Sequence, residues 1–288
     1  MKNTSTDNQA VRGPIGVFDS GFGGLSVLRS LQRRLPGYSY LYLGDNARAP
    51  YGTRSFDTVH RFTQQAVQYL FGCGCPLVIL ACNTASAKAL RTIQQRWLPV
   101  SDDPTRRVLG VIRPTAEQIG RVSRNGHVGV CATPGTIASG SYDIEIKKLN
   151  PGFTVTGHAC PMWVPLVEYG YADTPGADYF VRDDIGRLLD ADPLIDTVIL
   201  ACTHYPLLYN KIRAALPDDI ELLCQGDIVA DSLADYLERH PEIETRLLPT
   251  ADGQASTTYL TTDHPERFDQ TAALFLGAPV HAGTVSLP

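Results

Sequence analysis

The chain has 288 residues, of which 43% are hydrophobic, 8% aromatic and 19% charged, and it carries a net charge of −5. This composition excludes a disordered chain and a collagen-like repeat, and the acidic balance excludes the basic surface of a nucleic-acid-binding or membrane-anchored protein. The length fits one large domain or two of roughly 140 residues, with two favoured. We therefore expect a small-molecule substrate as the partner, with no nucleic acid and no membrane.

The ends and the cysteines indicate a reduced, cytoplasmic protein. Met1 to Arg12 is polar and has no apolar core of a signal peptide, so we expect a frayed terminus there. The longest apolar run, around Pro76 to Cys82, is too short to span a bilayer. An odd number of scattered cysteines without a CxxC pair argues against a disulfide framework and against a structural metal site. These are Cys73, Cys75, Cys82, Cys131, Cys160, Cys202 and Cys224.

The first third of the chain alternates short apolar runs with longer amphipathic segments. This alternation is typical of an α/β fold with a parallel sheet, which places its chemistry at the carboxyl ends of the strands. A glycine-rich turn from Asp19 to Gly24 joins the first strand to the first helix. In chain order we expect strands over 15–18, 40–43 and 77–80, and helices over 25–35, around 62–70 and from Ala85 onward.

The same pattern restarts after a charged connector, Ser101 to Arg107. The sequence of Val78 to Cys82 recurs identically as Val198 to Cys202, and each copy is followed by two polar residues and a predicted helix. Apolar strands resemble one another, but the shared continuation favours two α/β halves of like fold, each with a cysteine at the end of a strand. Here we expect strands over 108–112, 128–131, 154–159 and 197–200.

The two strand-end cysteines, Cys82 and Cys202, are candidate acid/base residues. A helix N-terminus beside a thiol lowers its pKa and favours the thiolate. Two such thiols facing one cleft can act on opposite faces of one carbon, one removing a proton while the other returns it, which inverts a stereocentre. A buried free cysteine is more often a small apolar residue, and that is our interpretation of the other five.

Polar residues near these strand ends have a functional and a structural interpretation. Asp19 either caps a helix, with Ser20 as a second cap, or orients an amine or assists a thiol. His204, two residues beyond Cys202, can tune that thiol or shuttle its proton. The turn Gly21 to Gly24 fits no phosphate-binding motif. Donors suited to a carboxylate ligand, or to capping helices, are Asn83, Thr84, Thr133, Thr136 and Thr203.

Taken together, the motifs resemble those of the bacterial glutamate racemases, cofactor-independent members of the aspartate/glutamate racemase superfamily. They run in the order of that family across residues 14–232, and the ordered set is specific although each motif alone is weak. The matching stretches are Phe18 to Ser26, Gly44-Asp45, Pro50 to Gly52, Ala81 to Ser86, Gly110 to Ile112, Thr133 to Ile137, Val164 to Glu168 and Ala201 to Leu208.

The resemblance implies interconversion of L-glutamate and D-glutamate by two-base proton transfer at Cα, without cofactor or metal, to supply D-glutamate for peptidoglycan. It implies that Cys82 takes the proton from D-glutamate and Cys202 from L-glutamate. Asp19 and His204 match auxiliary residues beside each thiol, and Asp45 and Glu168 match further acidic positions linked to catalysis. The substrate-binding positions it implies are Asp19, Ser20, Tyr51, Gly52, Asn83, Thr84, Thr203 and His204, with Thr133 and Thr136 in support.

The resemblance also implies two pseudo-symmetric α/β domains with mostly parallel sheets and the active site between them. We expect residues 1–107 plus 225–288 to form the first domain, which is discontinuous, and residues 108–224 the second. Members of the family are often homodimers. Arg113 departs from the family at the interdomain segment, and the tail after Gly277 matches nothing in it.

Three other functions remain open. An aspartate racemase of the same superfamily is the nearest, although that branch typically has Cys-Thr-Glu where this chain has Cys202-Thr203-His204. A non-catalytic amino-acid-binding protein would bind without exchanging the α-hydrogen. A thiol-dependent hydrolase would use one cysteine and leave the other without a role.

Overall fold

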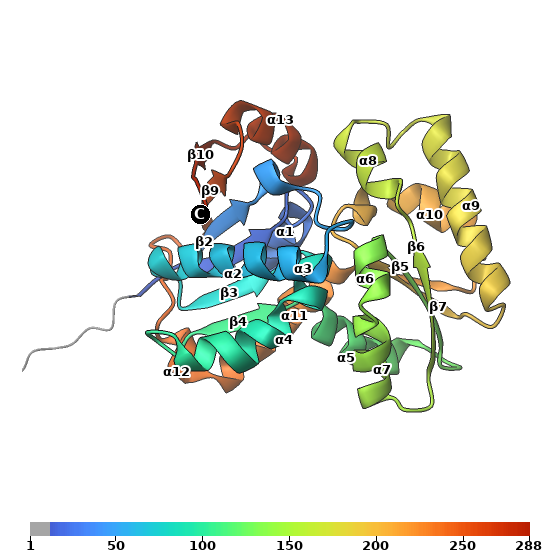
Figure 1. The fold of residues 1–288 in the computed structure, drawn as a ribbon, viewed down its shortest axis with the longest axis horizontal. Coiled ribbons are helices and arrows are strands. Elements are labelled where there is room, and N and C mark those ends of the chain that lie inside the picture. Colours follow the sequence, from blue (N-terminus) through green and yellow to red (C-terminus); the bar gives the residue numbers. More distant parts are fainter. Residues whose placement is uncertain (1–11) are drawn as a thin grey trace, which may run out of the picture.

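The computed structural model describes residues 12–288, so nearly all of the frayed terminus expected over 1–12 lies outside the described residues. It consists of two sheets with helices packed on their faces (Figure 1). The strand orders are β10-β9-β2-β1-β3-β4 and β6-β5-β7-β8, and every pairing between these strands is parallel. The α/β class expected from the sequence is confirmed. The strands are β1 (Ile15–Asp19), β2 (Ser39–Gly44), β3 (Leu77–Leu80), β4 (Arg107–Gly110), β5 (His127–Ala132), β6 (Thr154–Ala159), β7 (Thr197–Ala201), β8 (Glu221–Leu223), β9 (Ser256–Thr261) and β10 (Ala282–Thr284).

Helices connect the strands, and four of them begin with proline, whose fixed φ suits the first helical turn. The helices are α1 (Leu25–Arg34), α2 (Phe56–Gly72), α3 (Asn83–Lys88), α4 (Leu90–Thr92), α5 (Ile112–Val122), α6 (Pro134–Ala138), α7 (Ser141–Leu149), α8 (Trp163–Glu168), α9 (Pro175–Ala191), α10 (Tyr209–Ala215), α11 (Gln225–Arg239), α12 (Pro241–Glu244) and α13 (Pro265–Leu276). Shorter helical turns are η1 (Asn46–Arg48), η2 (Ile93–Trp97), η3 (Leu98–Val100) and η4 (Tyr205–Leu208).

The near-continuous apolar sequence of the strands follows from helices covering both faces of each sheet. Successive side chains of a strand point to opposite faces. Ile15 and Val17 of β1 therefore join one core with Leu28 of α1, whereas Phe18 joins another with Val59 of α2. All five residues are fully buried.

The strand expected over 108–112 requires a correction. β4 spans Arg107–Gly110 and pairs with β3, so it completes the first sheet instead of beginning the second. The chain crosses between the sheets only after Gly110, and α5 begins at Ile112. An apolar run shows that a strand forms but not which partner it finds. The division expected after residue 107 therefore cuts β4 from its own sheet, and the rest of the domain division stays a prediction.

The C-terminal part of the chain returns to the first sheet. β9 pairs along β2, and β10 pairs with β9, so strands far apart in the sequence lie side by side (Figure 1). The tail after Gly277, which matched no motif of the family, thus supplies an edge strand. Within residues 12–288 no helix is both long and apolar enough to cross a membrane.

Candidate active site

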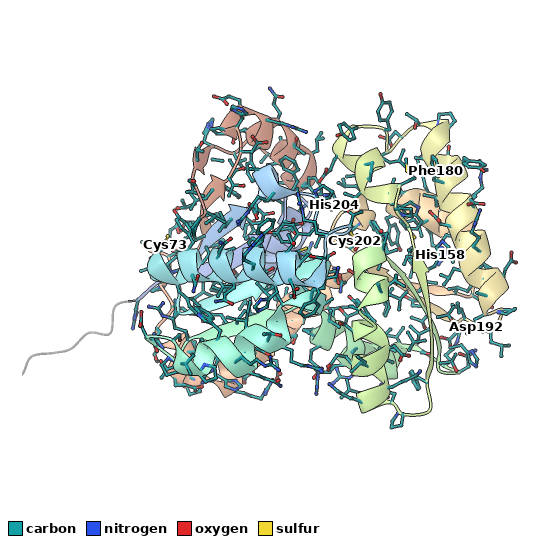
Figure 2. All side chains as sticks on the ribbon, in the orientation of Figure 1. Cys73, His158, Phe180, Asp192, Cys202 and His204 are labelled. Carbon is teal, nitrogen blue, oxygen red and sulfur yellow. The ribbon has the colours of Figure 1, made fainter. Side chains whose placement is uncertain are left out.

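The structure brings the two strand-end thiols to one cleft. Cys82 follows β3 of the first sheet and Cys202 follows β7 of the second, and both line a cavity of about 220 Å³. Figure 2 shows Cys202 and His204 near each other where the two halves meet. Both cysteines are buried, at 6% and 7% exposed. A larger cavity of about 600 Å³, lined among others by Arg91 and Glu145, contains neither thiol. We therefore take the smaller cleft as the candidate active site.

The surroundings of Cys82 correct the expectation of a lowered pKa. Its sulfur caps α3 by accepting a hydrogen bond from the Ala85 amide at 3.5 Å, and it lies 3.4 Å from Ser20 Oγ. Burial raises the pKa of Cys82 to about 12, and the nearby Asp19 carboxylate adds to the rise, against the lowering by the two hydrogen bonds. The helix has only six residues, so its terminus does not offset the desolvation of the sulfur. Cys82 is therefore a thiol in the free protein at neutral pH.

Cys202 has a different partner. His204 Nδ1 lies 3.8 Å from its sulfur, and His204 Nε2 lies 3.0 Å from Glu168 Oε1 at the end of α8. Burial lowers the pKa of His204, but the hydrogen bonds and charges of Cys202 and Glu168 outweigh it and raise the pKa to about 10. At neutral pH the ring is an imidazolium, which stabilises negative charge on the Cys202 sulfur.

Asp19 lies beneath the cleft and bonds to the second half. Its Oδ1 accepts from the Gly21 amide at 2.9 Å, and its Oδ2 lies 3.4 Å from Thr203 Oγ1, which donates to it. The carboxylate is fully buried, and that desolvation raises its pKa against the opposing charge of His204. Asp19 does not cap α1, because the residue at that N-cap is Gly24, without a side-chain bond. Its structural role is to hold the turn.

Threonine hydroxyls from both halves meet at one side of the cleft. Thr84 Oγ1 lies 3.0 Å from Thr133 Oγ1 and 3.3 Å from Thr136 Oγ1, and the last two are 3.1 Å apart. Thr84 and Thr133 line the cavity, whereas Thr136 lies behind them. Ser20, Tyr51, Gly52 and Thr203 also line it.

Asn83 lines the cleft, but its side chain is bonded to residues outside it. Its Nδ2 donates to Gln225 Oε1 at 2.6 Å, and its Oδ1 accepts from Tyr142 Oη at 2.6 Å. Gln225 Nε2 donates in turn to Thr115 Oγ1 at 2.9 Å. This buried network joins α3, α5, α7 and α11. The Gln225 side-chain amide therefore links the two segments in which the chain passes between the halves, at α5 and α11, to Asn83, the residue after Cys82. Gln225 and Tyr142 carried no signal in the sequence, because their partners are far apart along the chain.

Asp45, expected in the site, lies outside the cleft and acts on its wall. Its carboxylate accepts hydrogen bonds from Arg48 Nε, at 2.7 Å to Oδ2, and from Tyr51 Oη, and Tyr51 lines the cavity. The segment after Tyr51 is held from the other side, because the Gly135 amide donates to Gly52 O at 2.8 Å. Asp45 therefore fixes the ring of Tyr51 without facing a ligand.

The remaining cysteines fit the expected apolar role only in part. Cys75, Cys131 and Cys160 are buried, as expected of small apolar residues, but Cys73 is exposed and Cys224 half-buried. Cys160 also lines the cleft, which its sequence context did not indicate. Arg113, the departure at the crossing, forms an exposed ion pair with Glu117 at 2.7 Å, away from the thiols.

Comparisons with known proteins agree with this geometry. The sequence profile of the family described as Asp/Glu/hydantoin racemase matches residues 15–233. A glutamate racemase of Roseobacter denitrificans is 43% identical over 91% of this chain and 96% of its own. A glutamate racemase isoform of Bacillus anthracis has a TM-score of 0.86 at 34% identity, covering 96% of this chain and 98% of that one. The glutamate racemase of Francisella tularensis in complex with D-glutamate has a TM-score of 0.83 at 31% identity, with the same coverage.

Proposed function

Because this chain belongs to the Asp/Glu/hydantoin racemase family, we propose that it interconverts L-glutamate and D-glutamate by two-base proton transfer at Cα. The observation that carries the proposal is the position of Cys82 and Cys202. They come from the ends of strands in two different sheets and line one cleft. A pair of thiols on opposite sides of a bound amino acid is the arrangement that inversion at one carbon requires.

The reaction needs the two sulfurs in complementary protonation states, one thiolate and one thiol. A thiolate at Cys202, beside the imidazolium of His204, removes the α-proton of L-glutamate and becomes a thiol. The Cys82 thiol gives its proton to the opposite face of Cα and becomes a thiolate. The product is D-glutamate, and the protein holds the same number of protons as before, one of them moved from one sulfur to the other. The reverse reaction restores the first state.

The α-proton is weakly acidic because its removal places negative charge beside an existing carboxylate. Preorganised donors and exclusion of water must supply the stabilisation. The hydroxyls of Thr84, Thr133 and Thr203 are the donors we assign to the substrate carboxylates, with Ser20, Tyr51, Gly52 and the backbone of Asn83 completing the binding surface. Thr136 supports this group through its bonds to Thr84 and Thr133.

The charged residues divide into two groups in this proposal. His204 contacts Cys202 directly, whereas Asp19 bonds to Thr203 and acts on Cys82 through its charge. Glu168 acts through His204 by holding the imidazolium, and Asp45 acts through Tyr51 by fixing its ring. Glu168 and Asp45 are thus positioning residues.

The proposed role of the enzyme, in the cytoplasm, is to supply D-glutamate for peptidoglycan biosynthesis. It would thereby serve cell-wall formation and cell shape. A homodimer, common in the family, belongs to the same proposal. Light scattering of the reduced, full-length protein gives its mass in solution and tests that part separately.

The decisive experiment follows each enantiomer in D2O with proton NMR and circular dichroism. We expect the Cα–H signal to disappear and the optical signal to reach zero from both sides. Because the enantiomers have equal free energy in water, kcat/KM must be the same in both directions, which is an internal check on the assay. Binding without exchange would instead identify an amino-acid-binding protein, and a preference for aspartate would identify an aspartate racemase.

A further inference from the structure

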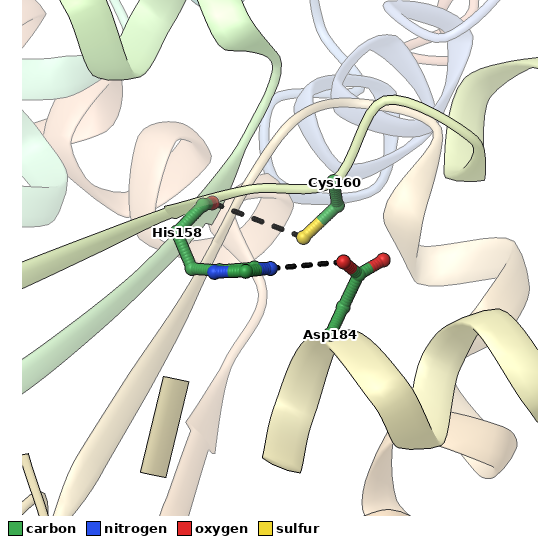
Figure 3. A group of neighbouring side chains, drawn as sticks. All are labelled: His158, Cys160 and Asp184. Atoms are coloured by element: carbon green, nitrogen blue, oxygen red, sulfur yellow. Dashed lines mark hydrogen bonds and ion pairs between the residues drawn. The ribbon is translucent and has the colours of Figure 1, made fainter. Parts of the chain in front are cut away.

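We propose that His158, Cys160 and Asp184 form a binding site for one divalent metal ion of the zinc class, separate from the two proposed catalytic thiols. His158 lies near the end of β6, Cys160 follows that strand, and Asp184 comes from α9, which packs on it. One imidazole nitrogen, the sulfur and one carboxylate oxygen all lie within 4.8 Å of one another. Figure 3 shows the three side chains pointing toward a common centre.

The three ligand atoms are those that zinc prefers. Zinc binds thiolate sulfur, imidazole nitrogen and carboxylate oxygen, usually with four ligands in a tetrahedron. His158 Nε2 lies 2.8 Å from Asp184 Oδ1, whereas ligands of a tetrahedral zinc lie about 3.3 Å apart. The ends of these two side chains must therefore move apart by roughly 0.5 Å to admit the ion. A water would complete the fourth position of the tetrahedron.

Asp184 has coordination capacity to spare. Within residues 12–288, the only hydrogen bond to its carboxylate comes from His158, although Asp184 is only 8% exposed. A buried carboxylate normally has more partners than one. His158 is partly exposed, which leaves a path for an ion from solvent.

A second histidine–aspartate pair on the same sheet shows what a purely structural pair looks like. His127 Nδ1 lies 2.9 Å from Asp192 Oδ2, near the opposite ends of the strands and of α9. Asp192 also accepts from the Leu194 amide and from Thr156 Oγ1, and this pair has no cysteine beside it. Among the residues described, the carboxylate of Asp192 thus has three hydrogen-bond partners, whereas the carboxylate of Asp184 has one and can still bind an ion.

Coordination is balanced by loss of one proton. Burial raises the pKa of the Cys160 thiol well above its usual range, so the free protein carries the thiol there. The ion forms a bond to sulfur as the S–H bond breaks, and the proton leaves to solvent. The occupied site ties α9 to the segment after β6, in which Cys160, Pro161 and Val164 line the cleft. Tyr205 Oη, three residues beyond Cys202, donates to Cys160 O at 3.1 Å. The ion would therefore stiffen one wall of the candidate active site.

The sequence offered no hint of this site. A structural zinc site usually shows paired ligands at short, regular spacing, whereas here Asp184 lies on a helix distant in sequence from the other two. Only the packing of α9 on β6 brings them together.

The test titrates Co²⁺ into tag-free, reduced, chelator-treated full-length protein and records the sulfur-to-cobalt charge-transfer band. Because the thiols of the cleft can bind a soft metal themselves, the titration is repeated in the Cys82→Ser/Cys202→Ser double variant. We expect one Co²⁺ per chain in both proteins and its displacement by Zn²⁺. Absence of the band from the double variant would place the metal at the cleft thiols and overturn the proposal.

Single substitutions in that background identify the ligands. Cys160→Ser should abolish the band, and Asp184→Asn should weaken Co²⁺ binding by roughly tenfold or more. Asp192→Asn, in the matched pair, should leave the affinity unchanged. Since Cys160 is fully buried and its variant can misfold, the comparison of Asp184→Asn with Asp192→Asn decides the question alone, with far-UV circular dichroism confirming that each is folded. Equal affinities in these two variants would refute the site.

Discussion

Gly23 is a position where one added methyl group should disable the site. A Cβ at Gly23 would lie 2.3 Å from Thr203 Oγ1 and 2.5 Å from His204 Nδ1, whereas an ordinary contact is 3.4–4 Å. The turn is linked to the Thr203 segment, because the single Ser26 hydroxyl proton is shared between Gly23 O at 2.8 Å and Thr203 O at 3.0 Å. The clash therefore falls on the two residues after Cys202.

The magnitude follows from these distances. In Gly23→Ala, Thr203 and His204 must each move by about 1 Å, either by turning their side chains or by opening the cleft. A misplacement of about 1 Å costs roughly 10²-fold in rate, so we expect kcat/KM to fall by about that factor in both directions. Overpacking should lower the free energy of unfolding by about 1–3 kcal/mol, which leaves the protein folded.

The assay is circular dichroism of L-glutamate and D-glutamate during turnover, with a thermal melt of each protein. Gly37→Ala is the matched control, because a Cβ at Gly37 meets nothing within 4 Å, and it should keep the activity of the wild type. A folded Gly23→Ala protein with wild-type kcat/KM would refute this prediction, because it would show that a Cβ at Gly23 does not displace Thr203 and His204.

Three further predictions address the thiols, the imidazolium and the buried network. Cys82→Ser and Cys202→Ser should each lower racemisation by roughly 10³-fold while leaving the melting temperature near that of the wild type, and full activity in either would contradict the two-base mechanism. In Glu168→Gln the pKa of His204 should fall, because burial lowers it and a raising partner is lost. The folded pKa of about 10 exceeds the ordinary 6.5, so the stabilisation is complete below pH 6.5 and is lost as the pH rises toward 10. Urea unfolding at pH 6, 8 and 10 should show the variant less stable by about 1–3 kcal/mol at pH 6, with a difference that disappears by pH 10; a constant difference would mean that His204 is not the titrating group. Gln225→Leu leaves Asn83 Nδ2 without its acceptor and Thr115 Oγ1 without its donor, so the free energy of unfolding should fall by about 1–3 kcal/mol for each group left unpaired and KM for glutamate should rise. Gln68→Leu, on the exposed surface of α2, should change stability by no more than about 0.5 kcal/mol, and equal effects of the two substitutions would count against the network.

Local sequence patterns were sufficient to predict the helices, the strands and the two thiols. Strand–helix alternation depends on the period of apolar residues within a few positions, so the strands around Ile15, Leu77 and Thr197 could be predicted from short windows. The carboxyl end of each strand is a local feature too, and it placed Cys82 and Cys202 where chemistry occurs in parallel sheets. The ordered motifs then indicated the family.

The partners of these elements and side chains depend on contacts between distant parts of the chain. β4 joined the first sheet, Asp45 turned to Tyr51 instead of a ligand, and Asn83 found Gln225 more than a hundred residues away. Burial, which a sequence pattern does not measure, reversed the expected pKa of Cys82 and left it a thiol. The same holds for Asp184 beside His158 and Cys160. Contacts between distant segments and the loss of water around a charge are properties of the packed chain, and these set the chemistry of each group.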